Sequence, residues 1–253
     1  GGPFEPGRPN PDAQAAQFGY NNDFLGFLPI DGRADHGLLV VNHEYTNAEL
    51  MFPGLARLGD RAEGFRSITR ALADTEMMAH GGSVLEVRRG ANGKWGVVAG
   101  SKYARRITAE TEIEISGPAA GHALMQTSAD PAGTRVKGML NCCGGGVTPW
   151  GTWLVCEENC NGYFWSKAAA TGDTAAARAL KRYGAPAEWY AWGRFHDRFD
   201  TAKEPNEPNR FGWVVEIDPF DPASTPVKRT ALGRFTHEGA GSIVNRDGRY
   251  VIY

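Results

Sequence analysis

Short apolar runs bounded by glycine and proline divide most of the chain, and this pattern predicts β-strands rather than long helices. Residues 37–41, Gly-Leu-Leu-Val-Val, form an apolar run that is typical of a buried strand. Residues 83–98 predict a hairpin, because two apolar runs flank the turn-forming sequence Gly-Ala-Asn-Gly at positions 90–93. Trp213–Ile217 begins another predicted hairpin, which returns near Val227–Thr230.

Two segments have the composition of helices. Arg57–His80 carries helix formers with few breakers, so we expect a helix in part of it. The alanine-rich stretch Ala168–Tyr183 predicts a second helix, which lies inside an insertion over residues 166–207. Residues 1–17 are rich in proline and glutamine without periodicity, and we expect them to form an irregular lead-in.

The bulk composition suits a single folded domain. The 253 residues include 33 glycines and 15 prolines, which favour many short strands and turns, and we expect one domain over residues 1–253. The formal net charge of -2 gives no strong attraction to nucleic acid or to an anionic membrane. No apolar run approaches the ~20 residues that a membrane span needs. Gly248–Tyr253 has the pattern of a strand inside which the chain stops, so we expect the N-terminal part of a larger protein.

A weak repeat connects three of the predicted strands. Gly37–Glu44 and Gly151–Glu158 each contain a glycine, a β run and a glutamate seven residues after the glycine. Gly248–Tyr253 starts the same plan and stops before its seventh position. The units lie farther apart than the ~40–50 residues of a propeller blade, so each holds about two blades or carries insertions.

The repeat predicts an all-β fold, a partial β-propeller with helical insertions between its strands. A β-sandwich explains the hairpins equally well. It does not explain why an acidic residue recurs at the exit of one particular strand.

The glutamates at these strand exits are candidate metal ligands. A carboxylate near a core costs free energy unless it is paired or bound to a metal. In a propeller the inner strands of different blades end near one central funnel, where Glu44 and Glu158 would converge. Such an oxygen-rich site suits Ca²⁺, Mg²⁺ or Fe³⁺. The alternative, that each glutamate pairs with an arginine or caps a turn, stays open. Glu158 is preferred to the adjacent Glu157, because only Glu158 lies seven residues after the glycine of its unit.

The four cysteines, Cys142, Cys143, Cys156 and Cys160, lie close together, but their spacing does not match a C-x2-C zinc site. The glycines at 144–146 predict a loop of tight backbone approach directly after the first pair. A thiolate on such a loop could act as a metal ligand or as a nucleophile. The alternatives are two buried structural cysteines, or a disulfide with Cys156 or Cys160.

A His-Glu dipeptide occurs twice, as His43-Glu44 and as His237-Glu238. In a zinc protease of the H-E-x-x-H type, a second histidine stands three residues after the glutamate, and neither dipeptide has one. We therefore expect His43 and His237 to support neighbouring ligands rather than to bind metal themselves.

Several of these segments together resemble the PhoX family of bacterial alkaline phosphatases. The matching stretches cover most of the chain in the expected order, and the Thr-Pro-Trp-Gly-Thr-Trp sequence at 148–153 is long and specific. The stretches are Phe18–Phe24, Val41–Thr46, Cys143–Asn159, Asn209–Pro222 and Lys228–Glu238.

The resemblance implies a β-propeller phosphatase with a cluster of ferric iron and calcium in its central funnel. Cys143 is preferred to Cys142 as the thiolate because it stands five residues before Thr148, as the family's cysteine does. The preceding position, usually asparagine in the family, is Cys142 here. A phosphate-contacting arginine and further ligands are expected beyond Tyr253, so this chain alone should be inactive. The ligand positions that the resemblance carries over are Glu44, Cys143, Glu158 and Glu238.

The resemblance also implies what the complete protein does. It would hydrolyse small-molecule phosphate monoesters with a metal-activated oxygen, in the periplasm or outside the cell. We expect a monomer without a nucleic-acid or membrane partner. Two other functions stay open: a calcium-stabilised propeller that only binds a ligand, and a calcium-dependent lactonase-type propeller enzyme, which would need no cysteine ligand.

Overall fold

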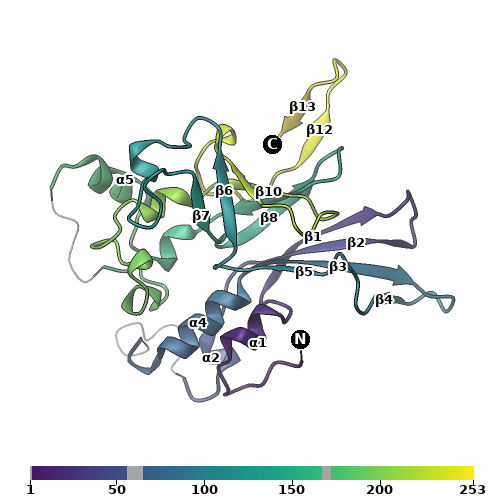
Figure 1. The fold of residues 1–253 in the computed structure, drawn as a ribbon, viewed down its shortest axis with the longest axis horizontal. Coiled ribbons are helices and arrows are strands. Elements are labelled where there is room, and N and C mark those ends of the chain that lie inside the picture. The colour runs from purple at the N-terminus through teal and green to yellow at the C-terminus, as the bar shows by residue number, and fades with distance from the viewer. Residues whose placement is uncertain (1, 56–64, 167–171) are drawn as a thin grey trace.

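The structure, a computed structural model, describes residues 2–55, 65–166 and 172–253 and is mostly β with few helices. Within these ranges the strands form a five-stranded sheet, a six-stranded sheet and a two-stranded hairpin. The long hairpins of the first sheet point to one side of the molecule, and the helix α5 lies on the opposite side (Figure 1). The strand ends that carry the candidate ligands therefore lie between these two sides.

The first sheet is an antiparallel meander in chain order, with one extra strand on its third member. Its β2 is the apolar run predicted at 37–41, and β3 with β4 is the hairpin predicted at 83–98, so both predictions are confirmed. The strands are β1 (Asn22–Pro29), β2 (His36–His43), β3 (Gly81–Arg89), β4 (Trp95–Val97) and β5 (Arg105–Ile107), the last paired with β3.

The second sheet has the strand order β7-β6-β11-β10-β9-β8. From β8 to β11 it is antiparallel in chain order, and β6 joins β11 in parallel. The pairing of β10 with β11 confirms the hairpin predicted from 213–217. The strands are β6 (Glu112–Ser116), β7 (Arg135–Lys137), β8 (Cys142–Val147), β9 (Trp153–Glu157), β10 (Val214–Ile217) and β11 (Val227–Arg229).

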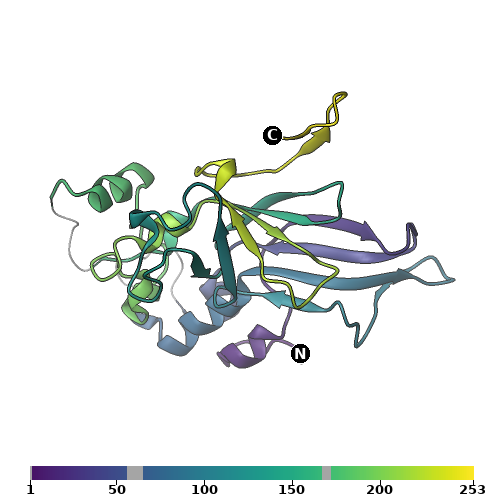
Figure 2. The same cartoon turned by 45° about the horizontal axis from the view of Figure 1, so that its top comes forward.

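A third, separate hairpin is formed by β12 (Ser242–Val244) and β13 (Tyr250–Ile252), and it projects from the rest of the chain (Figure 2). Both larger sheets contain four consecutive antiparallel strands, which is the arrangement of a propeller blade. None of the described sheets closes on itself. The mostly β character is thus confirmed, and the propeller stays a prediction.

Helices form in both segments whose composition predicted them. α4 (Arg70–Ala79) begins after Thr69, whose Oγ1 accepts a hydrogen bond from the Leu72 amide. α5 (Ala175–Tyr183) ends at Gly184, which has a left-handed backbone. Parts of both predictions, at 57–64 and 168–171, lie outside the described residues. Short 3-10 turns occur at Ala123–Met125, Cys160–Tyr163, Trp192–Arg194, Asp197–Phe199, Glu207–Arg210 and Thr230–Leu232.

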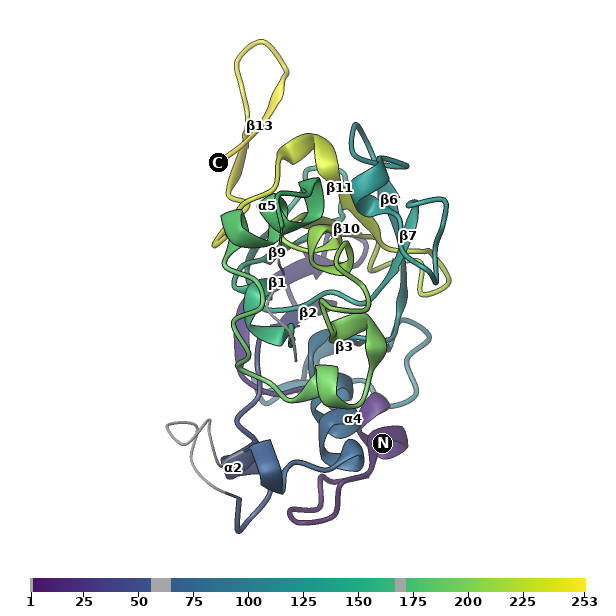
Figure 3. The same cartoon turned by 90° about the vertical axis from the view of Figure 1, so that its left-hand side faces the viewer.

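The lead-in at 1–17 is not wholly irregular, because Pro11–Ala15 forms the short helix α1. The Asn10 side chain accepts a hydrogen bond from the Ala13 amide at 3.0 Å, and proline occupies the first helical position, where it needs no hydrogen-bond partner. α1 packs on α4, and with α2 (Ala48–Met51) they gather at one end of the molecule, away from α5 (Figure 3). No helix in the described ranges is long and apolar enough to cross a membrane.

The two larger sheets are joined by a large apolar side chain and by a buried amide. Trp153 of β9 is fully buried, and its ring lies so close to β3 that a Cβ on Gly82 would approach it to 2.3 Å. Asn42 of β2 donates two hydrogen bonds into β8, to the carbonyl of Cys143 at 2.6 Å and to that of Gly144 at 2.9 Å. These contacts hold the exits of β2 and β9 near each other.

The glycines at 144–146 form part of β8, so the prediction of a loop was wrong. A Cβ on Gly144 would lie 2.0 Å from the Glu238 carbonyl oxygen, and one on Gly146 would lie 2.1 Å from that of Ala240. The Ala240 amide donates to the Gly145 carbonyl at 3.3 Å. The glycine run therefore lets the segment 238–240 lie directly on β8, where any larger residue would clash.

A buried ion pair stabilises the second sheet. Lys228 of β11 donates to both carboxylate oxygens of Glu157 at 2.8 and 3.0 Å, and both side chains are fully buried. Burial lowers the pKa of Lys228 and raises that of Glu157, while their pairing opposes both shifts. Glu157 also accepts hydrogen bonds from the amides of Leu140, Gly212 and Trp213. Both oxygens of this carboxylate therefore have hydrogen-bond donors within the fold.

We expect Lys228→Met to lower the free energy of unfolding by about 3–5 kcal/mol, because it leaves the Glu157 carboxylate buried without its cation. Chemical denaturation measures the change. The matched control is Arg135→Met, which removes the exposed partner of Glu112 and should have no measurable effect. A Lys228→Met protein as stable as this control would contradict the role assigned to the pair.

Candidate metal centre

Four carboxylates and one thiol converge where β1, β2, β8 and β9 meet the segment that lies on β8. We call Asp23, Glu44, Cys143, Glu158 and Glu238 the acid–thiol cluster. Within it, ligand atoms of Asp23, Glu44 and Cys143 all lie within 4.8 Å of one another. Glu44 and Glu158 directly follow the ends of β2 and β9, as the repeat predicted.

Hydrogen bonds connect the members of the cluster. The Cys143 thiol lies 3.5 Å from Asp23 Oδ2 and also hydrogen-bonds to Glu158. Asp23 hydrogen-bonds in turn to the Glu44 side chain. Two carboxylates can share a hydrogen bond only when one of them carries a proton, so in this arrangement the acids compete for protons.

Asn141 is the residue around which these side chains are arranged. It is almost fully buried, and its carbonyl accepts hydrogen bonds from the amides of Cys143 and Glu158, each at 3.0 Å. Its side chain donates to Glu44 Oε1 at 3.5 Å and accepts from the Asn159 amide at 2.6 Å. The backbone of Asn141 is left-handed, with φ 49°, a conformation that asparagine tolerates better than most residues. One residue thus fixes the backbone behind two members of the cluster and contacts a third.

The electrostatics of the cluster favour a cation. Burial, and then the charges of Asp23, Glu158 and Glu238, raise the pKa of Glu44 to about 7. Burial, the hydrogen bond with Glu158 and the neighbouring negative charges raise the pKa of the Cys143 thiol. Within the described ranges, none of the four carboxylates forms an ion pair with a basic side chain. The described part of the chain therefore leaves this negative charge without a basic partner.

The donor set fits metal ions. Carboxylate oxygens suit hard cations such as calcium and ferric iron, and a thiolate adds affinity for a transition metal. A bound cation would also remove the mutual repulsion that raises these pKa values. The chemistry of the residues thus agrees with a metal centre at this position.

The structure places Glu44, Cys143 and Glu158 together, and Glu238 is near enough for its charge to raise the pKa of Glu44. That these four residues bind metal stays a prediction. Sequence reasoning missed Asp23, which has no counterpart in the repeat. The register of the first sheet pairs Asn22 with His43, so that Asp23 lies beside the exit of β2. Its position within the family-like stretch 18–24 was the available signal.

The other three cysteines are buried in the fold. All four cysteines are free, so the disulfide with Cys156 or Cys160 that the sequence left open is not formed. Cys142 is fully buried and packs in the main core, whereas its neighbour Cys143 is partly exposed and reaches the cluster. The geometry therefore favours Cys143 over Cys142 as the thiol of the site.

The two histidines of the His-Glu dipeptides make hydrogen bonds away from the cluster. His43 is buried, with Nδ1 2.8 Å from Asn22 Oδ1 and Nε2 2.7 Å from Ser83 Oγ, and burial lowers its pKa to about 2. His237 donates from Nε2 to the Gly233 carbonyl at 3.1 Å. Through Asn22, His43 orients the strand end that carries Asp23.

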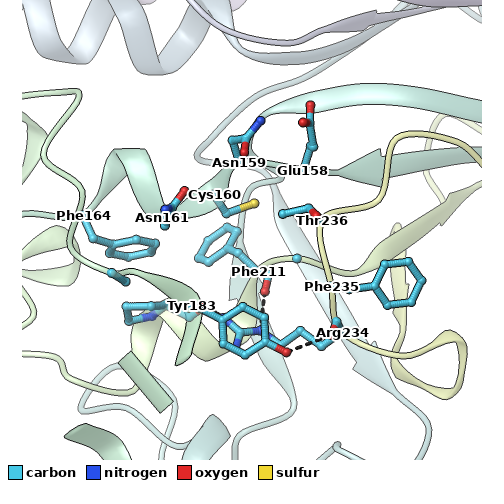
Figure 4. Close-up of a pocket in the computed structure, with 13 residues that line it drawn as sticks. Glu158, Asn159, Cys160, Asn161, Phe164, Tyr183, Phe211, Arg234, Phe235 and Thr236 are labelled. Carbon is cyan, nitrogen blue, oxygen red and sulfur yellow. Dashed lines mark hydrogen bonds between the residues drawn. The ribbon is translucent and has the colours of Figure 1, made fainter. Parts of the chain in front are cut away.

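Glu158 also borders a small cavity of about 70 Å³, shown in Figure 4. Arg234 lies on the far side of this cavity, and the Glu158 carboxylate points away from the cavity (Figure 4). The Arg234 guanidinium donates to the carbonyls of Phe211 at 2.8 Å and Pro208 at 2.7 Å, and it lies over the Tyr183 ring. This arginine is engaged in holding the fold and does not face the cluster.

The whole chain matches a known family. The family described as alkaline phosphatase PhoX matches residues 1–253. A solved structure, described as Pseudomonas fluorescens PhoX in complex with vanadate, a transition state analogue, superposes with a TM-score of 0.86 at 46% sequence identity. The match covers 98% of this chain and 41% of that chain, so this chain spans less than half the length of that relative. We found no match among curated protein sequences.

We expect Glu44→Gln and Asp23→Asn each to weaken metal binding by about 10-fold or more, because each removes a charged donor from the cluster. Elemental analysis after dialysis, together with calcium titration, measures the change. Glu114→Gln is the matched control, since it neutralises an exposed glutamate on β6. Equal metal content in the control and in both cluster variants would refute the site.

We expect Gly144→Ala to weaken metal binding without removing any ligand atom. Its Cβ would meet the Glu238 carbonyl and force the segment that carries Glu238 away from β8. The affinity for metal should fall by about 10-fold, as for other changes behind the ligands. Gly96→Ala, which meets nothing within 4 Å, serves as the control. Retention of full affinity in Gly144→Ala would show that Glu238 is not held by this contact.

Proposed function

Because this chain belongs to the PhoX family of alkaline phosphatases, we propose that the complete protein hydrolyses small-molecule phosphate monoesters at the acid–thiol cluster. The observation that carries the proposal is the cluster itself, four carboxylates and a thiol gathered without a basic partner among the described residues. The relative of known structure binds vanadate, described there as a transition state analogue. A phosphoryl-transfer site on this chain agrees with that complex.

The residues have the following roles in this proposal. Glu44, Cys143, Glu158 and Glu238 hold the metal ions, and Asp23 joins them as a further acidic ligand. Metal ions bound there would neutralise charge on the phosphoryl oxygens and activate an oxygen nucleophile.

Cys143 acts as a ligand and not as the attacking group. A nucleophilic cysteine needs a base, and the nearby His43 already has both ring nitrogens engaged by Asn22 and Ser83. The cysteine also argues against the lactonase-type alternative, which would need no thiol ligand.

We further propose that the metals are ferric iron and calcium. The thiol of Cys143 supplies the softer donor that favours iron over calcium, and the carboxylates supply the oxygen ligands that both ions accept. Visible absorbance from a thiolate–iron(III) bond, lost in Cys143→Ser, is the expected spectroscopic signature.

The rest of the centre is proposed to come from elsewhere in the complete protein. Arg234 is engaged with backbone carbonyls, so a phosphate-contacting arginine would be supplied by a part of the protein outside this chain. The two four-stranded meanders support a propeller in which further blades complete the funnel. A monomer that acts in the periplasm or outside the cell is part of the same proposal.

We expect Glu158→Ala and Cys143→Ser to lower kcat/KM for p-nitrophenyl phosphate by about 100-fold or more in the full-length protein, because each change removes a ligand of the metal centre. Steady-state turnover after reconstitution with iron and calcium measures this. Glu114→Gln changes an exposed carboxylate on β6, which β11, β10 and β9 separate from β8 in the sheet; it serves as the control and should keep full activity.

Vanadate should inhibit the wild-type protein competitively, because it mimics the transferring phosphoryl group. Normal turnover in both ligand variants would refute the ligand assignment. Metal binding by a wild-type protein without any turnover would favour the binding-module alternative.

A further inference from the structure

A second cavity, of about 280 Å³, opens directly beside the acid–thiol cluster. We call it the aromatic pocket, because Tyr45, Trp189 and Tyr190 form much of its wall. Glu44 and Asn141 line it as well, and both belong to or contact the cluster. A molecule in the pocket would therefore lie next to any phosphate held by the metal centre.

The buried wall of the aromatic pocket is rigid. The Tyr190 hydroxyl donates to the Thr46 carbonyl and accepts from the Thr46 amide, both at 3.0 Å. Its ring stacks on Tyr163, with ring centroids 4.7 Å apart and planes inclined by only 5°. The Tyr163 hydroxyl donates to the Glu44 carbonyl at 3.2 Å. The pocket wall and the backbone at Glu44 are thus parts of one bonded unit.

Trp189 is held in a fixed position on this wall. Its amide donates to the Gly162 carbonyl at 2.8 Å. A Cβ on Gly162 would lie 2.3 to 2.9 Å from three atoms of the indole, so the ring is seated on the bare glycine backbone. Tyr45 adds a second ring, which is 39% exposed. Preformed aromatic surfaces lose little entropy when they bind a flat ligand.

The size and chemistry of the pocket suit an aromatic ring. A cavity of about 150 Å³ is enough to hold benzene, so 280 Å³ accepts one ring together with its linking group. Tyrosine and tryptophan faces prefer offset-stacked or edge-on aromatic partners over saturated groups of the same size. The acidic side of the pocket is at Glu44, where the phosphate end would reach the metal centre.

We propose that the aromatic pocket is the leaving-group subsite and that it selects phosphate monoesters of alcohols that carry a flat aromatic ring. The inference rests on the proposed phosphatase function and adds the substrate class to it. Trp189 and Tyr45 determine the selection by contact with the ring and take no part in the chemical step.

The test compares three phosphate monoesters with the full-length, metal-loaded protein. Benzyl phosphate carries the aromatic ring, cyclohexylmethyl phosphate is its saturated counterpart of similar size, and methyl phosphate has no ring. All three release primary alcohols, so their intrinsic reactivities are close. We expect kcat/KM to be highest for benzyl phosphate and to exceed that for cyclohexylmethyl phosphate several-fold, as stacking energies of this kind imply.

Two variants address the pocket. Trp189→Ala and Tyr45→Ala should each lower the ratio of kcat/KM for benzyl phosphate over methyl phosphate, by about tenfold for the tryptophan and less for the tyrosine. Tyr45 is exposed, so its variant keeps the test valid if Trp189→Ala fails to fold. Trp95→Ala removes an exposed tryptophan on β4, which packs edge-to-face against Phe27, and is the matched control.

The outcomes separate this inference from the proposed function. A wild-type protein that hydrolyses none of the three esters contradicts the phosphatase function itself. Hydrolysis of all three with no preference for benzyl phosphate refutes the subsite while the function stands. A preference that survives in both pocket variants refutes the assignment to Trp189 and Tyr45.

Discussion

The hydrogen bonds of Asn141 are the interactions on which the site depends. Its carbonyl accepts hydrogen bonds from the amides of Cys143 in β8 and of Glu158, which directly follows the paired strand β9. Its side chain reaches Glu44, which follows β2 of the other sheet. A left-handed backbone turns the chain into β8 at this point. Because one buried residue makes all these contacts, a shift of either sheet would move several ligands at once. The cluster therefore behaves as one unit with the strands behind it.

A steric constraint acts together with these bonds. The segment 238–240 can lie on β8 only because Gly144 and Gly146 present no side chains to it. Glycine in a strand weakens that strand. The pairing of β8 with β9 and the hydrogen bond from the Asn42 side chain therefore have to hold β8 in place. The glycines lower the local stability of β8, but they allow Glu238, which is distant in sequence, to approach the acidic residues of the first sheet. Such a local conflict with strand propensity is expected at a functional site.

Two adjacent glutamates show how the fold separates structure from function. Glu157 is fully buried and is satisfied by Lys228 and by three backbone amides. Glu158, the next residue, turns to the cluster, where it meets a thiol and other acids instead of a cation. The alternation of side chains along a strand puts the two on opposite sides. The Glu157 carboxylate is already paired with Lys228 and is not free to bind a metal, whereas Glu158 forms no ion pair with a basic side chain in the described ranges.

The sequence predicted those features that depend on local pattern, and it missed those that depend on contact between sheets. Apolar alternation and turn residues sufficed for the hairpins, and the glycine-to-glutamate offset sufficed to choose Glu158 over Glu157. Asp23 and the strand at 144–146 escaped because their roles follow from the register of β1 with β2 and from the segment packed on β8. The capping signal of α1 was present at Asn10 and Pro11, but five helical residues are too few for periodicity to show. None of the described sheets closes on itself, so closure into a propeller stays a prediction.

The same contacts that assemble the cluster also connect it to the aromatic pocket. Tyr163 stacks on Tyr190 in the pocket wall, and its hydroxyl contacts both the Glu44 carbonyl and the Asn141 side chain. The position of the wall and the position of the metal ligands are therefore set by one group of buried residues. A leaving group in the pocket would meet rings whose distance from the reacting phosphate cannot change independently. Preorganisation of this kind lets binding energy from the non-reacting part of a substrate contribute to the rate of the chemical step.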